Sequence, residues 1–304
     1  GGGPMMQGKT NLQDFIESIE FVEKLYDFVR IVDPVAKKVS KLEGNNLENT
    51  DAICYDFWKE GRSCENCISA RALLDEETHI KLEYNGEKLY MITAVPVKFK
   101  DKSVVLELLK DVTYNSVLFD VEGKSIDDIN NALKTKNALI IQDSLTGVYN
   151  RRFVDERLPY EILESFIEKK PLSVIITDID YFKKVNDAYG HLTGDEAIKV
   201  FSEKIKNCLR KDGDWVSRYG GDEFVIFLKN TDLDIAKMII ERIKNSVEST
   251  CIHYENHCVQ ITASFGIVTL NGKNSTLQEL MEQADKNLYG AKKGEDNGMV
   301  ASYF

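Results

Sequence analysis

Two consecutive glycines between two strand-like runs constrain this chain most, in the segment RYGGDEF at residues 218–224. The flanking residues are aromatic and β-branched, as is typical of strands. Gly220 and Gly221 accept the positive φ that two-residue turns need, so we expect a tight hairpin. Asp222 and Glu223 would lie at its tip, where paired carboxylates could hold a divalent cation beside a phosphate. The alternative is an ordinary acidic hairpin with solvated charges.

Length and composition exclude several classes of protein. The 304 residues allow about two domains, and 43% hydrophobic and 29% charged residues are typical of a globular protein. A net charge of −11 argues against a nucleic-acid-binding surface. No apolar run approaches the roughly 18 to 20 residues that span a bilayer, and no secretory segment opens the chain, so we expect a cytoplasmic protein without a membrane segment. Residues 1–10, which begin GGGPM, are expected to be a disordered tag remnant.

The N-terminal half, residues 11–113, shows the pattern of a small sheet domain. Helical spacing of apolar residues predicts a helix over residues 11–26, and a strand follows at residues 28–32. A hairpin is predicted over residues 81–97, around Asn-Gly, and another strand over residues 103–109. This order, which ends in an Asp-Val-Thr triplet, resembles a PAS sensor domain.

Three of the six cysteines are concentrated in this half. Cys64 and Cys67 have CxxC spacing, and Cys54 precedes them by ten residues. Three thiolates could hold zinc or iron, with Glu65, His79 or an external group as the fourth ligand. The alternative is a set of partly buried structural or redox-active thiols. We expect the cysteines to reflect a metal or redox site in a reducing compartment and not a disulfide scaffold.

Residues 114–142 form the expected linker between two domains. Ser125 with Asp128 is a predicted helix start, and a narrow apolar stripe follows from Ile126 to Ile140. Such a stripe suits a two-stranded coil, or packing of the helix against its own domain.

The C-terminal half, residues 143–304, contains a continuous apolar run at residues 172–177 that leads into acidic residues. The run predicts a central strand buried on both faces, and it ends at Asp178. Asp178 would then lie at the edge of a sheet, within reach of Asp222 and Glu223. Two acidic clusters from neighbouring strands suit a magnesium–nucleotide site, because Mg²⁺ takes oxygen ligands and usually keeps phosphate oxygens among them. We expect Asp180 to cap the strand end and not to be a ligand.

Four motifs, in this order and spacing, make the second half similar to a known family. They are DSLTGVYNRRF, DIDYFKKVNDAYGH, TGDEA and RYGGDEF. This part of the chain resembles the GGDEF family, bacterial diguanylate cyclases that join two GTP molecules into cyclic di-GMP. The resemblance implies an α+β fold like the palm of nucleotidyl cyclases, with a central, mostly antiparallel sheet flanked by helices. Helices are expected near residues 196–209, 233–249 and 277–292, and one strand over residues 259–270.

The resemblance also implies the catalytic groups. Asp178, the carbonyl of Ile179, Asp222 and Glu223 would hold one or two Mg²⁺ or Mn²⁺ ions on the triphosphate. The two hairpin carboxylates, Asp178 and Lys183 would form the catalytic set. Glu223 or Asp222 would accept the proton of the attacking hydroxyl.

Further residues would bind the substrate. Phe182 and Lys183 would contact the β and γ phosphates, and Lys292 would add a positive charge. Asn186 and Asp195 would read the guanine, since a carboxylate can accept hydrogen bonds from N1 and the exocyclic amine. The glycines of the hairpin, Gly220 and Gly221, complete the implied substrate site.

Two departures from the family pattern bear on regulation and affinity. Many members carry an inhibitory product site that begins with arginine and ends with aspartate; here Lys211 and Asp214 occupy those positions. Lysine lacks the bidentate guanidinium, so product inhibition should be weak or absent, although Arg210 and Arg242 lie nearby in sequence. The family's final arginine is also missing, because residues 295–297 read EDN. Its loss should weaken GTP binding.

One GTP per domain implies a homodimer, because two substrates must meet. The sequence therefore predicts a sensor-regulated diguanylate cyclase. Two alternatives stay open: a catalytically weak domain that only binds GTP or cyclic di-GMP, and a metal or redox sensor whose output is partner binding.

Overall fold

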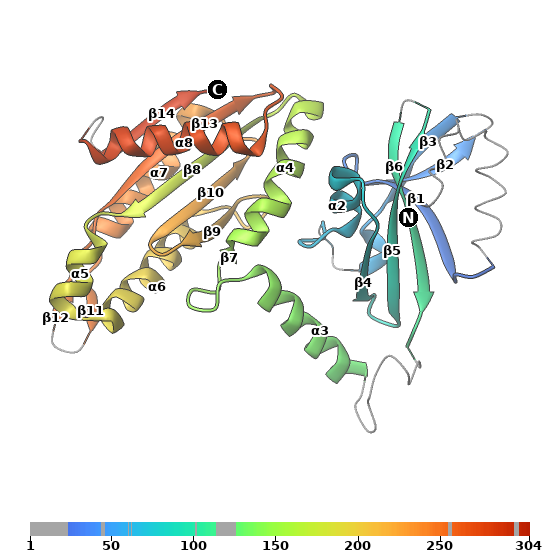
Figure 1. Ribbon diagram of the computed structural model, residues 1–304, viewed down its shortest axis with the longest axis horizontal. Coiled ribbons are helices and arrows are strands. Elements are labelled where there is room, and N and C mark those ends of the chain that lie inside the picture. Colours follow the sequence, from blue (N-terminus) through green and yellow to red (C-terminus); the bar gives the residue numbers. More distant parts are fainter. Residues whose placement is uncertain are drawn as a thin grey trace, which may run out of the picture. The chain divides into compact units, whose positions relative to one another are not determined.

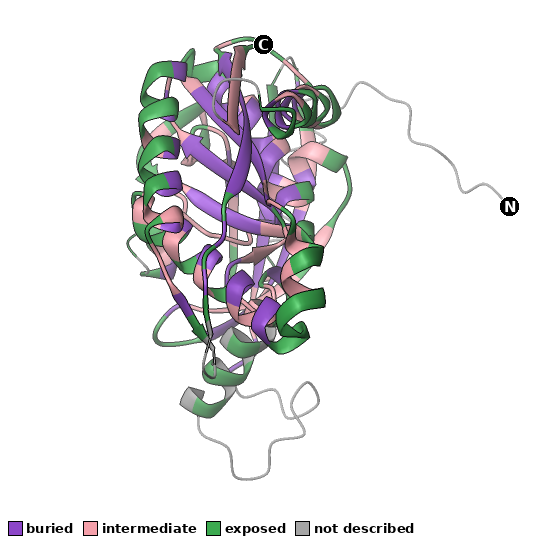
Figure 2. Cartoon of the chain, turned by 90° about the vertical axis from the view of Figure 1, so that its left-hand side faces the viewer, coloured by how far each residue is buried: buried purple, intermediate pink, exposed green. Residues whose placement is uncertain are grey.

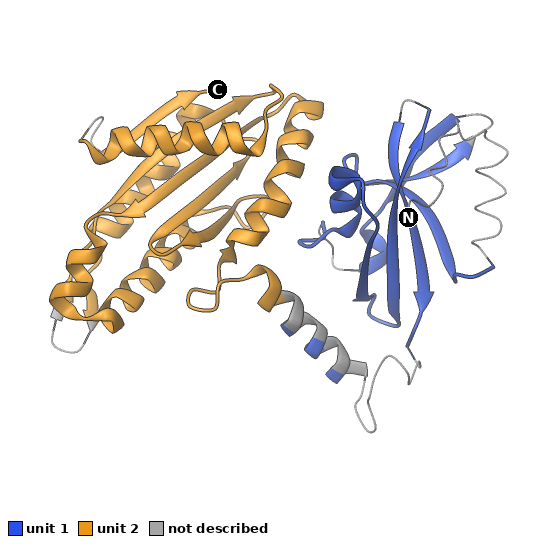
Figure 3. Cartoon of the chain, viewed as in Figure 1, with its two compact units in different colours: residues 1–137 blue, residues 138–304 orange. Residues whose placement is uncertain are grey.

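The computed structural model describes residues 24–43, 46–59, 61, 63–100, 102–113, 126–254, 257–294 and 298–304. Two compact units divide the chain, residues 1–137 and 138–304 (Figure 3). Most of the helix expected over residues 11–26 lies outside the described residues, as do Ser125 and residues 295–297. No helix in the described part of the chain has both the length and the apolar character to cross a membrane.

The first unit contains one antiparallel sheet of six strands in the order β3-β2-β1-β6-β5-β4 (Figure 1). Its strands are β1 Phe28–Asp33, β2 Lys38–Glu43, β3 Asn46–Ile53, β4 His79–Tyr84, β5 Leu89–Phe99 and β6 Lys102–Asp111. A short 3-10 helix, η1 (Asp56–Trp58), and helix α2 (Ile68–Asp75) connect β3 to β4. The predicted strands and hairpin are confirmed, whereas identity with a PAS domain stays a prediction.

A buried ion pair lies within this sheet. Arg30 Nε of β1 is 2.6 Å from Glu107 Oε2 of β6, and Ser69 Oγ of α2 donates to the other oxygen of Glu107. The Arg30 guanidinium also lies over the Phe57 and Trp58 rings. Because a buried carboxylate is costly without partners, these contacts explain how Glu107 is accommodated in the core.

Helix α3 (Ile126–Ile141) spans the division between the two units, and the role of residues 114–142 as a signalling linker stays a prediction. Its last residue, Ile141, is buried in the core of the second unit, whereas Leu139 and Ile140 are exposed. The end of the helix is therefore anchored to the second unit. Pairing of α3 with a second copy stays a prediction.

The second unit has a six-stranded sheet in the order β14-β13-β8-β10-β9-β7. The strands are β7 Tyr149–Asn150, β8 Pro171–Ile179, β9 Trp215–Gly220, β10 Glu223–Lys229, β13 Ala263–Asn271 and β14 Met299–Tyr303. The four central strands are antiparallel, and the two outer pairs are parallel. Five helices accompany them: α4 Arg151–Glu168, α5 Phe182–Tyr189, α6 His191–Cys208, α7 Leu233–Glu248 and α8 Leu277–Lys292. The predicted mostly antiparallel sheet flanked by helices is confirmed.

Alternate residues of the central strands face two separate cores. Ile175 of β8 and Phe224 of β10 pack with α6 and α7, whereas Val174 and Val225 pack with α4 and α8. The strands are accordingly buried between two layers of helices (Figure 2). This double burial explains why β8 reads as a continuous apolar run.

The predicted strand over residues 259–270 is confirmed from Ala263 onward, but its predicted start is wrong. β11 (Ile252–Tyr254) and β12 (His257–Val259) form a separate hairpin, and β13 begins only at Ala263. The chain leaves the hairpin at Gln260 to enter the central sheet, and Thr262 binds Asp180 at this bend.

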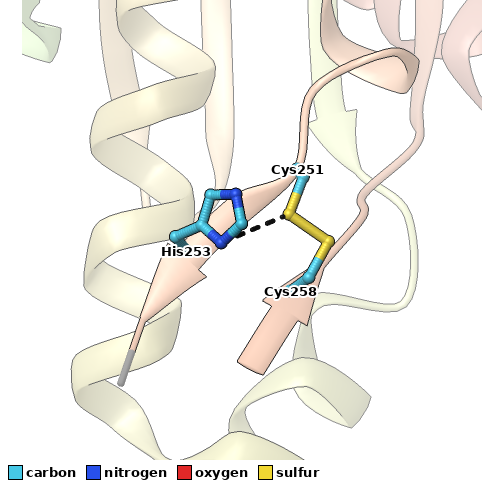
Figure 4. The surroundings of a disulfide bond; sticks show 3 residues. All are labelled: Cys251, His253 and Cys258. Atoms are coloured by element: carbon cyan, nitrogen blue, oxygen red, sulfur yellow. Dashed lines mark hydrogen bonds between the residues drawn. A yellow bond between two sulfur atoms is a disulfide. The ribbon is translucent and has the colours of Figure 1, made fainter. Parts of the chain in front are cut away.

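A disulfide closes this small hairpin, which differs from the metal or redox role that the sequence predicts for the cysteines. Cys251 and Cys258 are bonded, and His253 Nδ1 lies 3.7 Å from Cys251 Sγ (Figure 4). Antiparallel pairing of β11 with β12 brings the two thiols together. The other four cysteines form no disulfide.

Candidate active site

The register of the central strands places the predicted carboxylates at one end of the sheet. Glu223, the first residue of β10, is directly opposite Asp178 of β8, and Ser264 of β13 flanks Asp178 on the other side. Asp222 precedes Glu223 in the hairpin turn. The structure therefore brings Asp178, Asp222 and Glu223 to the same edge, with the carbonyl of the buried Ile179 next in the chain.

The turn itself is shifted by one residue from the predicted one. Gly220 ends β9 and pairs with Glu223, so Gly221 and Asp222 are the two turn residues, and only Gly221 has positive φ (+53°). A β-bulge at Tyr219 produces the shift, because Phe224 pairs with Arg218. Arg218 Nε donates to the Gly221 carbonyl at 2.8 Å, which fixes the turn.

Neither glycine of the hairpin is required by packing. A Cβ built on Gly220 or Gly221 would meet no protein atom within 4 Å. Gly220 also has no positive φ to explain its identity. The backbone of the turn is therefore open to a ligand, which a side chain would obstruct.

The local electrostatics favour a cation at this edge. Burial raises the pKa of Asp178; the Lys292 ammonium opposes this rise, and the charges of Asp222 and Glu223 add to it. Lys292 Nζ, at the end of α8, is 2.9 Å from Asp178 Oδ2, and the Asp178 side chain is only 13% exposed. Asp178 thus contacts an ammonium and also feels the charges of two further carboxylates. Lys292 belongs to the site, and its predicted contact with phosphate stays a prediction.

A close approach of α8 to the sheet places Lys292 there. A Cβ on Gly266 of β13 would lie 2.2 Å from the Ala284 carbonyl and the Leu288 amide nitrogen. Glycine at this position therefore lets the helix backbone rest on β13.

The strand β8 leads directly into the N-terminus of α5. Phe182 and Lys183 are its first two residues, and no side chain caps the helix. Their backbone N–H groups lack acceptors within the helix, because the first N–H groups of any helix have none. The side chain of Phe182 packs against the core, whereas Lys183 is exposed. These features suit binding of an anion.

The two predicted guanine-reading residues lie on α5 and α6, which pack together. Asn186 is on α5 and Asp195 on α6, and both are partly exposed. Between them is Gly194, where a Cβ would lie 1.9 Å from Asn186 Oδ1 and 3.1 Å from the Phe182 ring. Gly194 therefore leaves the space that the Asn186 amide occupies, a role that the sequence analysis missed.

Replacing Gly194 with alanine should raise the KM for GTP about tenfold with a smaller change in kcat. The new methyl group forces the Asn186 amide to turn away, and a misplaced polar group weakens binding. Steady-state kinetics would measure the change. Gly272→Ala is the control for damage to the fold: it also adds a methyl group where space is restricted, and strain at a positive φ (+64°), but just after β13 ends, far from Asp178. An unchanged KM in Gly194→Ala would contradict the role given to Asn186.

Arg218 and Asp180 are held by structural contacts. Arg218 Nη1 is 3.2 Å from Asp143 Oδ1, shortly after α3, so Arg218 pairs with an acid of its own unit. Asp180 accepts hydrogen bonds from Thr262 and Ser264. The predicted structural role of Asp180 is therefore supported, and its two partners were not foreseen.

The residues of the predicted degenerate inhibitory site have separate partners. Arg210 donates to both Asp214 oxygens, at 2.8 and 2.6 Å, and the Asp214 side chain is 0% exposed. Arg242 Nη2 donates to the Cys208 carbonyl. Lys211 is exposed. Asp214 is thus already satisfied by a neighbouring arginine.

The three cysteines of the first unit gain no support as a metal site. Burial, with a contribution from Cys67, raises the pKa of Cys54 to about 12, and burial also raises the pKa of Cys64. Both thiols therefore stay protonated at neutral pH unless a bound cation displaces the proton. Cys67 instead caps α2 by accepting from the Ala70 N–H. Across the described residues, no three histidine, cysteine, aspartate or glutamate side chains are arranged to enclose a metal ion.

Comparison with known proteins identifies the second unit. The family described as diguanylate cyclase, GGDEF domain, matches residues 140–298, more than half of the chain. Diguanylate cyclase A of Treponema denticola is 33% identical over 219 residues, which cover 68% of this chain and 58% of that protein. The response regulator PleD of Caulobacter vibrioides is 33% identical over 176 residues, 57% of this chain and 38% of that protein. The chain thus matches less than two thirds of the length of either relative.

Solved structures agree with this result. The coiled coil and GGDEF domain of DgcB from Caulobacter crescentus, in complex with c-di-GMP, has a TM-score of 0.54 at 25% identity, covering 58% of this chain and 93% of that one. Diguanylate cyclase SiaD of Pseudomonas aeruginosa, in complex with its activator SiaC, has a TM-score of 0.52 at 31% identity, covering 58% of this chain and 66% of that one. The chain therefore belongs to the GGDEF diguanylate cyclase family.

Proposed function

We propose that this protein is a diguanylate cyclase that converts two GTP molecules into cyclic di-GMP and two pyrophosphates. One observation carries the proposal: three carboxylates meet beside an uncovered glycine turn, and the strand that bears one of them continues into the uncapped N-terminus of α5. Such a site can hold a cation and a polyphosphate together.

The residues present fit Mg²⁺ or Mn²⁺. Mg²⁺ is usually held by one or two carboxylates plus substrate phosphates and not by a cage of protein ligands, so the carboxylates at this edge of the sheet suit it. Asp178, the Ile179 carbonyl, Asp222 and Glu223 would hold it. When bound, the ion would neutralise charge on the phosphate oxygens and lower the pKa of a nearby hydroxyl.

The remaining groups would orient GTP. The N–H groups of Phe182 and Lys183, with the Lys183 and Lys292 side chains, would bind the phosphates. Asn186 and Asp195 would accept and donate hydrogen bonds at the guanine edge, which favours GTP over ATP.

Each half-reaction forms one bond and breaks one. The 3′ oxygen of one GTP bonds to the α phosphorus of the other, the bond to pyrophosphate breaks, and the hydroxyl proton passes to Glu223 or Asp222. A second, equivalent step closes the ring. Because each domain would bind one GTP, two copies of the chain must face each other, as a homodimer.

The first unit would regulate this reaction. We assign residues 11–113 to a PAS-like sensor, residues 114–142 to the linker and residues 143–304 to the cyclase. The burial of Ile141, at the end of α3, in the cyclase core gives the linker a fixed attachment through which the dimer can be controlled.

Incubation of the purified protein with GTP and Mg²⁺ tests the proposal. Chromatography and mass spectrometry should detect cyclic di-GMP, with two pyrophosphates released per product, and omission of divalent cations should abolish both. Binding of GTP without pyrophosphate release would show the catalytically weak alternative instead.

Added cyclic di-GMP should leave the initial rate almost unchanged. Arg210 already occupies both oxygens of Asp214, and Lys211 cannot provide a bidentate contact. Lys211→Arg alone should not create strong inhibition, because Asp214 stays engaged. Initial rates measured with increasing product would show this, and tight inhibition of the unmodified protein would contradict it.

A further inference from the structure

We propose that Asp180 is a positioning residue for the triphosphate site: with Thr262 and Ser264 it holds the turn at Tyr181, which directs the first N–H groups of α5. This inference rests on the proposed function, because it concerns how the same site binds GTP. Asp180 itself would touch neither nucleotide nor metal.

The contacts of Asp180 join the end of β8 to the start of β13. Its Oδ2 accepts from Thr262 Oγ1 and its Oδ1 from Ser264 Oγ, both at 2.7 Å. The Asp180 N–H also donates to the Thr262 carbonyl at 2.9 Å. Ser264 is fixed in turn, because Thr177 Oγ1 donates to its carbonyl at 2.8 Å. Asp180 is thus held by three hydrogen bonds to Thr262 and Ser264, where β13 begins.

The next residue needs such support. Tyr181 has φ of +52°, a conformation that non-glycine residues rarely adopt and that surrounding structure must impose. Tyr181 is 74% exposed and does not belong to the core, although Lys184 Nζ lies 4.2 Å from its ring centroid. The constraint on the Tyr181 backbone therefore comes mainly from the anchored Asp180 on one side and from α5 on the other.

The conformation of Tyr181 sets the direction of α5. Its carbonyl accepts the N–H of Lys184 at 2.8 Å, which forms the first turn of the helix. Phe182 and Lys183 lie inside this turn. If Tyr181 relaxed to an ordinary conformation, their N–H groups would point elsewhere, and the predicted phosphate contacts would be lost.

The geometry separates this role from that of a metal ligand. Both carboxylate oxygens of Asp180 already accept hydroxyl groups, whereas Asp178 has Lys292 as its partner. Removing the two hydroxyl groups should therefore have the same effect as removing the carboxylate.

Kinetics of four variants test the proposal: Asp180→Ala, Asp180→Asn, the double variant Thr262→Val with Ser264→Ala, and Thr269→Val. Asp180→Ala and the double variant should each raise the KM for GTP by about 10- to 100-fold, with a smaller change in kcat, because the phosphate-binding groups are misplaced. Asp180→Asn, which keeps one carbonyl acceptor, should be intermediate. The Mg²⁺ concentration that gives half-maximal rate, at saturating GTP, should not change.

Thr269→Val is the matched control. Thr269 Oγ1 lies 2.7 Å from Ser173 Oγ at the other end of the same two strands, so its loss removes a similar contact without touching the turn. Its KM should equal that of the unmodified protein. Thermal unfolding should confirm that every variant is folded. If Asp180→Ala is unfolded, the KM values of the double variant and of Asp180→Asn still test the positioning role.

Two results would overturn the proposal. One is an unchanged KM in the double variant. The other is a strong rise in the Mg²⁺ requirement of Asp180→Asn alone, which would make Asp180 a metal ligand. The dissociation constant of a fluorescent GTP analogue, measured in the presence of Mg²⁺, gives a second readout. If the protein binds this analogue but forms no product, the proposed function fails while the positioning role is still tested by binding.

Discussion

Replacing Glu223 with glutamine, or Asp178 with asparagine, should lower the rate of cyclic di-GMP formation by at least about 100-fold. Loss of one group that stabilises charge in a transition state commonly costs this much in rate. The two residues face each other across β10 and β8, and each substitution removes a negative charge while keeping the shape of the side chain. Pyrophosphate release and product chromatography at saturating GTP and Mg²⁺ would measure the loss. Thermal unfolding should show that both variants are folded.

Glu241→Gln is the control for this pair. Glu241 is an exposed carboxylate on α7, so the same chemical change there should leave the rate within about twofold, as for most surface substitutions. Equal rates in the unmodified protein, Glu223→Gln and Asp178→Asn would exclude a metal site at this edge of the sheet. If Glu241→Gln lost activity along with Glu223→Gln and Asp178→Asn, the cause would be a general effect of charge.

The central sheet of the second unit could be predicted because its pattern is local. The continuous apolar run of β8 indicates burial on both faces, and the paired glycines indicate a hairpin. The turn was misplaced by one residue because the bulge at Tyr219 depends on pairing with β10. The break before Ala263 was missed because it depends on Thr262 contacting Asp180, 82 residues earlier. Such long-range contacts leave no periodic signal.

In the candidate site, too, residues in local motifs could be predicted and residues that depend on long-range packing could not. Asp178, Asp222 and Glu223 follow from motifs, and the register of the strands confirms that they share one edge. The space above Gly194 depends on how α5 packs on α6, which no single segment shows. The disulfide between Cys251 and Cys258 could have been predicted, because two cysteines seven residues apart flank a short hairpin.

Replacing Asp195 with asparagine should remove most of the preference for GTP over inosine triphosphate. The two nucleotides differ only by the exocyclic amine at C2. We propose that the Asp195 carboxylate accepts hydrogen bonds from this amine and from the N1 proton. A hydrogen bond to a charged group contributes about 1.5 to 3 kcal/mol, which corresponds to a factor of about 10 to 100. The unmodified protein should therefore favour GTP by this factor in kcat/KM, and Asp195→Asn should use both nucleotides about equally.

This comparison separates recognition from general damage to the enzyme. Glu203→Gln changes an exposed carboxylate on the same helix and should keep the preference for GTP. If Asp195→Asn loses activity but still favours GTP to the original extent, Asp195 does not read the base. Another group must then accept the hydrogen bond of the amine. If instead the preference disappears while kcat for GTP is largely retained, substrate choice resides on α6, and the carboxylates of the hairpin and of β8 serve the reaction itself.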